Sequence, residues 1–317
     1  MRFLRSIPCW LTLSLATVVT GCNRATQPPA QPVASLDAAS IPRDDLGRAI
    51  KLTRVPQRIV TIGPGATETL FAIGAGKSLV GRDSGSDFPT SVKSIPVVAN
   101  YEGPFFEKVV AARPDLVIVQ GETWDKERID MWQQKCGAPV AALTPVTLEQ
   151  VAGDIEKMGA WLDRKDDAQT LAKTLRKGFQ SADASAPTAL LEVQREPLMV
   201  AGRDTLVDDV MRRAGLANAA REVRGYKQFS VEKLIAQAPD FYVLTVKPAD
   251  RKRAVSELKR HPIFGRLACV RRNRILVVDG DLVLRPGPRL SEGIAQLAEQ
   301  AGSVVKKQPL PNVTPVR

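Results

Sequence analysis

Histidine is nearly absent from this 317-residue chain, in which His261 is the single example. Zinc clusters and Ser-His-Asp or Cys-His nucleophile systems need an imidazole at a defined position, so the sequence argues against a metallohydrolase or a triad enzyme. Runs of five or more basic residues are also missing, although Lys+Arg 45 against Asp+Glu 34 gives a net charge of +11. We therefore expect no dedicated nucleic-acid groove, while an anionic partner remains compatible with the charge.

Long apolar runs are missing too, except at the N-terminus. Two arginines precede a mostly apolar segment from Ile7 to Val19, which is too short to span a membrane as a stable helix. Small residues follow, and the pattern predicts a signal peptide over residues 1–21. Val19-Thr20-Gly21-Cys22 resembles a bacterial lipobox, which implies lipidation of Cys22. The alternative is an ordinary signal peptide with a chance cysteine.

Residues 22–43 are rich in proline, glutamine and alanine, with few large apolar side chains, and are predicted to be a flexible tether to the lipid. Lipid is then the only membrane anchor, and the protein is expected on the extracytoplasmic side of the cell envelope. Of the four cysteines, Cys136 and Cys269 remain in the folded part. They lie in different halves of the chain. An exporting environment would allow them to pair, but we favour two buried free thiols.

The mature chain repeats one local pattern, a short apolar strand followed by a Gly/Pro loop and a helix. Such alternation is typical of parallel sheets covered by helices. We predict an α/β protein with two Rossmann-like lobes. The strand-like runs are Arg58–Ile62, Leu116–Val119, Val140–Leu143, Ala189–Val193, Tyr242–Val246 and Ile275–Val278. The expected segments are an N-terminal lobe over 44–146, a linking helical segment over 147–185, a C-terminal lobe over 186–306 and a tail over 307–317.

An internal repeat supports the two-lobe interpretation. Residues 101–119 align with residues 226–244 at an offset of 125, and composition alone predicts roughly one identity. The identical pairs are Tyr101/Tyr226, Glu107/Glu232, Lys108/Lys233, Ala111/Ala236, Pro114/Pro239 and Asp115/Asp240. A second correspondence places Glu68 and Asp209 each six residues before a glycine, on the first predicted helix of its half.

Two glycine-rich segments do not fit nucleotide binding. Residues 71–78 lack the first glycine of a phosphate-binding loop and are better explained as a helix that stops at glycine. Residues 63–68 lie between a strand and a helix, but Glu68 would oppose a pyrophosphate. We therefore expect no dinucleotide or other cofactor.

Aromatic side chains near the repeat are candidates for ligand contact. The repeat presents Tyr101 and Tyr226 in loops ahead of equivalent helices, with Trp124 and Phe229 nearby. Paired aromatic faces suit a large, flat, partly apolar ligand, although each ring could instead belong to the core. Arg285 belongs to an Arg-Pro-Gly-Pro-Arg turn and either is solvated or faces an anionic group. We expect His261 to be structural.

Acids at helix starts have two interpretations. Glu68 and Asp209 are either favoured there by the helix dipole or form a paired docking surface, because they occupy matching positions in the two lobes.

Three stretches together resemble the extracytoplasmic binding proteins for cobalamin, iron-siderophores and haem. They are Arg58 to Arg82 with its Gly63-Pro64-Gly65-Ala66-Thr67-Glu68 block, Glu107 to Val119 with Pro114-Asp115, and Asp208 to Gly215 with the later Arg285 to Arg289 turn. The resemblance implies two lobes joined by a rigid long helix, with the ligand in a cleft between them. It is closest to the cobalamin branch, through Tyr101 and the Arg-Pro-Gly-Pro-Arg turn.

The resemblance also implies function and partners. The chain would capture cobalamin, a related corrinoid, or alternatively an iron-siderophore or haem, and deliver it to the permease dimer of an ATP-driven importer. Ligand contacts are expected from Tyr101, Trp124, Tyr226, Phe229 and Arg285. One carboxylate per lobe would pair with permease arginines, at Glu68 and at Asp209, where the family usually has glutamate. We expect a monomer without enzymatic activity. An exported α/β hydrolase is a distant alternative, and a purely structural lipoprotein is disfavoured.

Overall fold

Short runs of branched residues form two separate sheets in the computed structural model, which describes residues 42–122, 124–177 and 186–307. Both sheets belong to one compact unit. The signal peptide, Cys22, almost all of the tether and the tail after residue 307 lie outside the described residues, so those predictions stay predictions.

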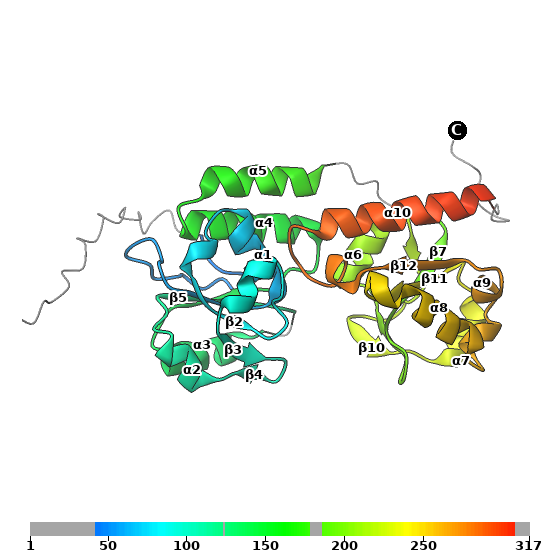
Figure 1. The fold of residues 1–317 in the computed structure, drawn as a ribbon, viewed down its shortest axis with the longest axis horizontal. Coiled ribbons are helices and arrows are strands. Elements are labelled where there is room, and N and C mark those ends of the chain that lie inside the picture. Colours follow the sequence, from blue (N-terminus) through cyan, green and yellow to red (C-terminus); the bar gives the residue numbers. More distant parts are fainter. Residues whose placement is uncertain (1–41, 123, 178–185, 308–317) are drawn as a thin grey trace, which may run out of the picture. The chain divides into compact units, whose positions relative to one another are not determined.

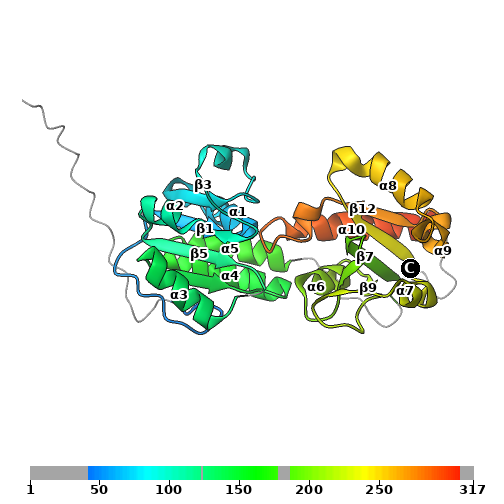
Figure 2. The same cartoon turned by 90° about the horizontal axis from the view of Figure 1, so that it is seen from below.

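The N-terminal lobe has a sheet in the order β4-β3-β2-β1-β5-β6 (Figure 1). Every neighbouring pair is parallel except β3 and β4. Its strands are β1 Ile59–Ile62, β2 Leu79–Asp83, β3 Val97–Asn100, β4 Gly103–Pro104, β5 Leu116–Gln120 and β6 Val140–Leu143. Its helices are α1 Pro64–Ala72, α2 Phe106–Ala111 and α3 Lys126–Cys136. Figure 2 shows α3 alongside the β5 and β6 side of this sheet.

The C-terminal lobe has a sheet in the order β10-β8-β7-β11-β12, with β9 beside β7. Its strands are β7 Thr188–Gln194, β8 Met199–Ala201, β9 Ala217–Asn218, β10 Tyr226–Gln228, β11 Phe241–Thr245 and β12 Ile275–Val278. Its helices are α6 Leu206–Arg213, α7 Val231–Gln237, α8 Arg251–Arg260, α9 Ala268–Arg271 and α10 Leu290–Lys307. Short 3-10 turns cover 76–78, 90–94, 248–250, 264–266 and 280–282.

The two sheets are mixed, where the sequence predicted parallel ones. β4 runs antiparallel to β3, and β8 runs antiparallel to both β7 and β10. The reason is connection length, because only residues 101–102 separate β3 from β4 and only residues 195–198 separate β7 from β8. A parallel crossover needs about a dozen residues or more, so these short links form hairpins.

Helices α4, Leu148–Trp161, and α5, Lys165–Arg176, follow the strands of the first sheet in the sequence and precede those of the second. The two helices pack against each other side by side (Figure 1). The apolar residues Leu148, Val151, Ile155 and Met158 of α4 recur at helical spacing and are buried, and Thr147 and Gln150 form a capping box at its start. The largest cluster of buried apolar side chains includes residues of both lobes together with α4 and α5. The linking role of the segment over 147–185 stays a prediction, and residues 178–185 lie outside the described residues.

The sequence repeat corresponds to a structural repeat. The offset of 125 carries the start of α2 onto the start of α7 and the start of β5 onto the start of β11. Asp115 accepts hydrogen bonds from the backbone N–H groups of Gln57 (2.9 Å) and Arg58 (2.8 Å), just before β1. Asp240 accepts one from the N–H of Thr188 (2.9 Å), the first residue of β7. Each repeated aspartate thus ties its strand to the neighbouring parallel strand.

The glycine stop predicted after residue 72 is confirmed. Gly74 has a φ of +76°, and the Ala75 N–H donates to Leu70 O at 2.9 Å. A left-handed residue at this point ends α1 and satisfies its last carbonyls, as glycine commonly does. The segment is therefore a helix end and not a phosphate-binding loop.

Candidate functional site

A hollow of about 690 Å³ lies at the carboxyl ends of β1, β2, β3 and β5 in the N-terminal lobe. This edge is where parallel α/β sheets bind ligands. It brings together Tyr101 and Trp124, two of the predicted ligand residues. The lining residues are Ile62, Gly63, Pro64, Asp83, Asn100, Tyr101, Glu102, Gly103, Pro104, Phe105, Phe106, Gln120, Trp124, Arg128, Met131 and Trp132.

One wall of this hollow is aromatic. The Trp124 and Trp132 rings meet edge to face with centroids 4.8 Å apart, and Phe106 meets Trp132 in the same way at 5.7 Å. Such pairs hold their rings in fixed orientations, each with about 0.5–1.5 kcal/mol beyond burial. A preformed aromatic wall of this kind suits a large ligand with an extended apolar face.

Cations surround the aromatic wall. The Arg128 guanidinium lies 5.7 Å from the Trp124 ring centroid, and the Lys135 ammonium lies 4.8 Å from that of Phe106. Lys108 approaches Phe105 similarly, at 4.7 Å. These contacts leave positive charge near the rim of the hollow, where it can meet acidic or polar groups of a ligand.

Two polar atoms in the lining are buried and have no hydrogen-bond partner among the described residues. They are Trp124 Nε1, a donor, and Gln120 Oε1, an acceptor. Buried polar groups are nearly always paired, so such atoms need an explanation. A ligand or ordered water with polar groups at its edge would satisfy both.

The two repeated tyrosines have different surroundings. Tyr101 lies in the turn between β3 and β4 and is 94% exposed, and its hydroxyl makes a long 3.4 Å contact to Glu102. Tyr226 begins β10 and is 38% exposed, and its hydroxyl donates to Glu122 Oε1 of the other lobe at 3.2 Å. The Leu206 N–H also points to this oxygen at 3.5 Å. Burial raises the pKa of the Glu122 carboxyl above its usual value, and these two donors offset only part of that rise.

Phe229 is buried in the C-terminal lobe. Its N–H pairs with Leu198 O at 2.8 Å, and its ring is buried in a core cluster of the C-terminal lobe that includes Leu234. This backbone pairing directs the side chain inward just after β10 ends. The structure thus gives Phe229 a packing role, and ligand contact by this residue stays a prediction, against which its burial argues.

Glu68 is buried and paired with two arginines. It is 3% exposed, and its carboxylate accepts hydrogen bonds from Arg289 Nη2 (2.6 Å), Arg289 Nε (2.9 Å) and Arg285 Nη1 (3.3 Å). The arginines belong to the predicted turn before α10. The carboxylate thus ties α1 of one lobe to the C-terminal lobe, and docking through Glu68 stays a prediction, against which this burial argues.

Asp209 is enclosed in a similar way and is also 3% exposed. Its carboxylate accepts the N–H of Leu148 at 2.8 Å, which is the first residue of α4, and it pairs with Arg212 and Arg213. Its carboxylate therefore joins α6 to the linking helix. Docking through Asp209 also stays a prediction, and the burial of both acids argues against it.

Arg285 lines a smaller hollow of about 260 Å³ at the carboxyl ends of β11 and β12. Its guanidinium already pairs with Asp87 at 2.7 Å, Asp281 at 2.9 Å and Glu68 at 3.3 Å. The anionic groups that the turn was expected to face are thus protein carboxylates. Arg285 thus connects α1 and the loop at Asp87 to the turn before α10, and both of its Nη atoms already have carboxylate partners.

Two exposed glutamates were missed as docking candidates. Glu107 lies in the first turn of α2, and Glu232 lies in the first turn of α7. The Ser230 hydroxyl donates to Glu232 at 2.6 Å and lowers the pKa of that carboxyl. The signal was present in the sequence, because these are the repeated Glu107/Glu232 pair.

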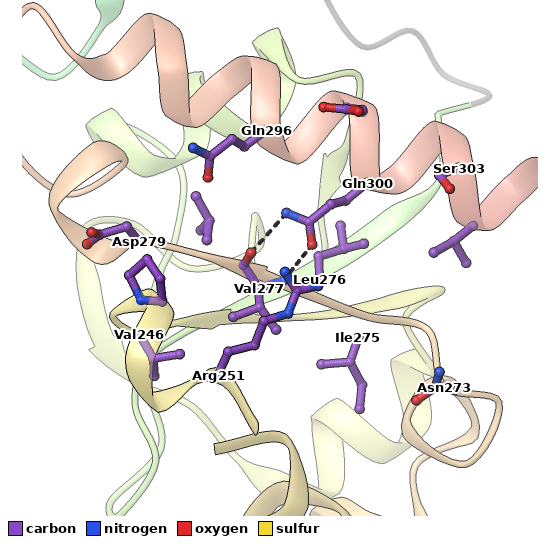
Figure 3. A pocket seen from close by; sticks show the side chains of 14 residues that line it. Val246, Arg251, Asn273, Ile275, Leu276, Val277, Asp279, Gln296, Gln300 and Ser303 are labelled. Carbon is purple, nitrogen blue, oxygen red and sulfur yellow. Dashed lines mark hydrogen bonds between the residues drawn. The ribbon is translucent and has the colours of Figure 1, made fainter. Parts of the chain in front are cut away.

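Another hollow, of about 540 Å³, runs along the outer edge of β12 (Figure 3). There Gln300 of α10 accepts the Val277 N–H at 3.0 Å and donates to Val277 O at 2.9 Å. The side-chain amide thus acts as a neighbouring strand and covers the sheet edge. This hollow extends along the strand and is not confined to the carboxyl ends, so we do not assign the ligand to it.

Several other expectations concern single residues. Cys136 and Cys269 are both buried and free, as predicted. His261 Nδ1 accepts the N–H groups of Ile263 and Phe264, each at 3.2 Å, which supports its structural role. Within the described residues, no cluster of His, Cys, Asp and Glu could hold a metal ion. In the same part of the chain, no helix has both the length and the apolarity to cross a membrane.

Comparisons with known proteins agree on one family. A family model described as periplasmic binding protein matches residues 59–282. A substrate-binding lipoprotein of an ABC transporter, YvrC of Bacillus subtilis, is 28% identical over 92% of this chain and 95% of its own. A vitamin B12-binding protein of Vibrio parahaemolyticus is 25% identical over 80% of this chain and 92% of its own. A haem-binding protein structure from Pseudomonas aeruginosa has a TM-score of 0.66 and 30% identity over 78% and 94%. These relatives are binding proteins, not enzymes, as the sequence predicted for this chain.

Proposed function

Because this chain belongs to the periplasmic binding protein family, we propose that it captures cobalamin or a related corrinoid outside the cytoplasm and delivers it to an ABC importer. Its role as an extracytoplasmic substrate-binding protein of such an importer follows from the family and its relatives. The choice of ligand, the lipid anchor and the docking residues are our proposals.

The hollow in the N-terminal lobe carries the ligand proposal. Its volume, its aromatic wall and its place at the strand ends suit one face of a macrocycle. The unpartnered Trp124 Nε1 provides a donor for the amide groups at a corrin edge. Tyr101 at the rim provides a movable aromatic face. Tyr226 remains a proposed ligand contact from the other lobe. Its hydroxyl would leave Glu122 and form a hydrogen bond to the ligand instead.

Haem is a second candidate, favoured by one observation. The Tyr101 hydroxyl is at the rim of the hollow and has a single long contact, so it is free to coordinate iron. Tyrosine is an established axial ligand of haem iron. The similar structure from Pseudomonas aeruginosa is of a haem-binding protein.

Titration of the lipid-free protein tests these ligands. Cyanocobalamin, hemin and a ferric siderophore are added in turn and followed by calorimetry and absorbance. Trp124→Ala and Tyr101→Ala should each weaken binding of the true ligand by about 1–3 kcal/mol, the range for an aromatic anchor. Lys252→Ala on α8 is the matched surface control.

Tyr101→Phe separates the two candidates. It keeps the ring, so a corrinoid should bind nearly as before, whereas an iron-bound haem should lose its phenolate ligand and shift its absorption bands. If none of the three ligands binds, the ligand proposal is refuted. If the ligand binds and both alanine variants bind equally well, the site lies elsewhere.

For docking, we propose the exposed pair Glu107 and Glu232. The resemblance implies one carboxylate per lobe that pairs with permease arginines. These two acids occupy equivalent helices, are exposed and carry no ion pair among the described residues. Reversing both charges with Glu107→Lys and Glu232→Lys should abolish uptake and leave ligand affinity intact. Normal uptake by that double variant would refute this assignment.

The lipid anchor rests on the lipobox-like tetrapeptide and on the lipoprotein from Bacillus subtilis. Cys22 lies outside the described residues. Cys22→Ala should release the protein from membranes and end its labelling by palmitate. Continued membrane attachment with labelling would show that the anchor assignment is wrong.

A further inference from the structure

Most of the chain's net positive charge lies in one short segment of the C-terminal lobe. Residues 251–274 cover α8, the turn after it, α9 and the three residues that follow α9. This segment contains nine Lys and Arg residues and one acid, Glu257, whereas the other 293 residues contain 36 basic and 33 acidic ones. A net charge of +8 out of +11 is thus concentrated in 24 residues.

Most of these cations are exposed and lack a carboxylate partner. Eight of the nine side chains are exposed, and the ninth, Arg274, is buried. Arg253 pairs with Asp250 and Glu257. The other seven exposed cations have no ion pair among the described residues, and we call them the basic face: Arg251, Lys252, Lys259, Arg260, Arg266, Arg271 and Arg272. Like charges gathered on one surface repel one another, so such a surface is stabilised when an anionic partner binds it.

The basic face is continuous in the folded lobe. Helix α8 contacts α9, and both contact the 3-10 turn at 264–266 between them (Figure 1). Arg251 of α8 and Asn273, the residue after Arg272, line the same hollow along β12 (Figure 3). Arg251, Lys252 and Lys259 also line a hollow of about 480 Å³ along one side of α8. The cations of α8 and those at the end of α9 therefore belong to one surface.

Acidic side chains border the basic face but do not neutralise it. The two acids that pair with Arg253 are occupied by it, and Asp279 of the hollow along β12 pairs with Lys247 at 3.4 Å. Glu299 of α10 lines the same hollow and has no ion pair among the described residues. Seven cations are thus left with one unpaired acid beside them, and the surface selects an anionic partner.

An exposed apolar side chain lies beside these cations. Ile263 is 43% exposed, between α8 and the 3-10 turn at 264–266, and is three residues from both Arg260 and Arg266 in the sequence. Exposed apolar side chains among cations are typical of surfaces that rest on an anionic membrane, where the apolar group enters the headgroup boundary and the cations meet lipid phosphates. Because the cations are spread over two helices and a turn, they suit such an extended surface better than a small anion.

We infer that the basic face binds the anionic phospholipid headgroups of the membrane that carries the protein. The inference rests on the proposed lipid anchor, since a flexible tether over residues 22–43 would have a root-mean-square length of about 25 Å. This short reach gives the lipid surface a high effective concentration at the basic face. The family's place outside the cytoplasm separates the chain from the nucleic acids of the cell, which are the other abundant polyanions.

Vesicle sedimentation with the full mature chain, prepared without its lipid, tests the inference. We expect the protein to sediment with phosphatidylcholine vesicles that contain about 30% phosphatidylglycerol, because anionic headgroups attract clustered Lys and Arg. It should stay in solution with pure phosphatidylcholine, and the bound fraction should fall as the salt concentration rises.

A charge-reversed variant and its matched control locate the binding surface. The partition coefficient should fall by on the order of a hundredfold or more when four cations of the basic face are reversed together, in Lys252→Glu, Lys259→Glu, Arg271→Glu and Arg272→Glu. The control reverses four exposed lysines outside the segment and should keep most of the binding, although its net charge changes equally. It combines Lys51→Glu, Lys93→Glu, Lys165→Glu and Lys173→Glu. Thermal midpoints confirm that both variants are folded.

The outcomes distinguish this inference from the proposed function. A protein that stays in solution with the anionic vesicles would overturn it, and so would an equal loss of binding in the control, because total charge would then explain the attraction. Retention on immobilised heparin without vesicle binding would overturn it in favour of a polyanionic polymer. None of these results bears on the lipid anchor or the ligand, because the protein is lipid-free and its ligand titrations are separate measurements. A failure of palmitate labelling at Cys22 would refute the anchor and leave the vesicle result standing.

Discussion

The carboxylate of Glu68 connects the two lobes, and its removal should be costly. It accepts hydrogen bonds from Arg289 at 2.6 and 2.9 Å and from Arg285 at 3.3 Å, and its side chain is 1% exposed. Removing one partner of a buried ion pair costs about 3–5 kcal/mol, because it leaves the other charge without compensation. Here the arginines keep some contact with water, and Arg285 keeps Asp87 and Asp281. We therefore expect Glu68→Ala to lower the free energy of unfolding by about 2–3 kcal/mol, below that range.

Two further variants separate charge from shape. Glu68→Gln keeps the size and one acceptor but removes the charge, so it should cost about 1–2 kcal/mol, the order of a lost charge-assisted hydrogen bond. Combining Glu68→Ala with Arg289→Ala removes both partners. The double variant should be much less unstable than the sum of the two single variants, because neither charge is then left alone.

Denaturant unfolding of the lipid-free protein, followed by both tryptophan fluorescence and circular dichroism, gives the free energies for this cycle. The two probes must coincide before a two-state treatment is applied to a two-lobed chain. A coupling energy below about 0.5 kcal/mol between Glu68 and Arg289 would refute the reasoning. It would mean that the carboxylate and the arginine do not act as a pair in solution.

Three other predictions concern separate contacts. Burial raises the pKa of the Asp154 carboxyl from 3.8 to about 8, so the folded state keeps a proton that the unfolded state releases, and the free energy of unfolding should fall as the pH rises towards 8. Asp154→Asn should remove this fall, measured as the thermal midpoint against pH. Thermal midpoints of the variant and the parent that depend on pH in the same way would contradict it. Gly65→Ala would place a Cβ 2.2 Å from Pro286 O, so we expect the free energy of unfolding in denaturant to fall by about 1–3 kcal/mol. An unchanged free energy would show that α1 and the turn at Pro286 can move apart at little cost. Tyr226→Phe should remove the hydrogen bond to Glu122 and increase the radius of gyration of the unliganded protein in X-ray scattering; an unchanged radius would show that this bond does not hold the lobes.

The fold was predictable where one local pattern has a local structural cause. The repeated Pro-Asp pairs predicted two equivalent helix–strand units. The structural cause is local, because each aspartate accepts backbone N–H groups at the start of a neighbouring strand. The apolar spacing of α4 and the stop at Gly74 depend on residues within one or two turns. The antiparallel edge strands were missed, since alternation alone does not show which connections are too short for a crossover.

The site was predictable in part, for a related reason. Tyr101 directly follows β3 and Trp124 lies four residues after the end of β5, so the strand ends determine their place. Glu68 is different, because its partner Arg289 lies 221 residues further along the chain. A helical acid has the same local sequence whether it faces solvent or another lobe. Phe229 shows the limit at shorter range, since it lies three residues after Tyr226 and yet points into the core.

The features that the two halves of this chain share help to separate a docking surface from a ligand-binding surface. Asp115 and Asp240 keep the same structural role, and Glu107 and Glu232 keep the same exposed place. The tyrosines kept their identity but diverged in surroundings, because one lies free at a rim and the other bonds to Glu122. A partner built of two equivalent subunits requires matching features in both lobes, whereas one ligand bound between unlike lobes does not. On this reasoning, docking residues are to be sought among the exposed repeated positions and ligand contacts among the positions that have diverged.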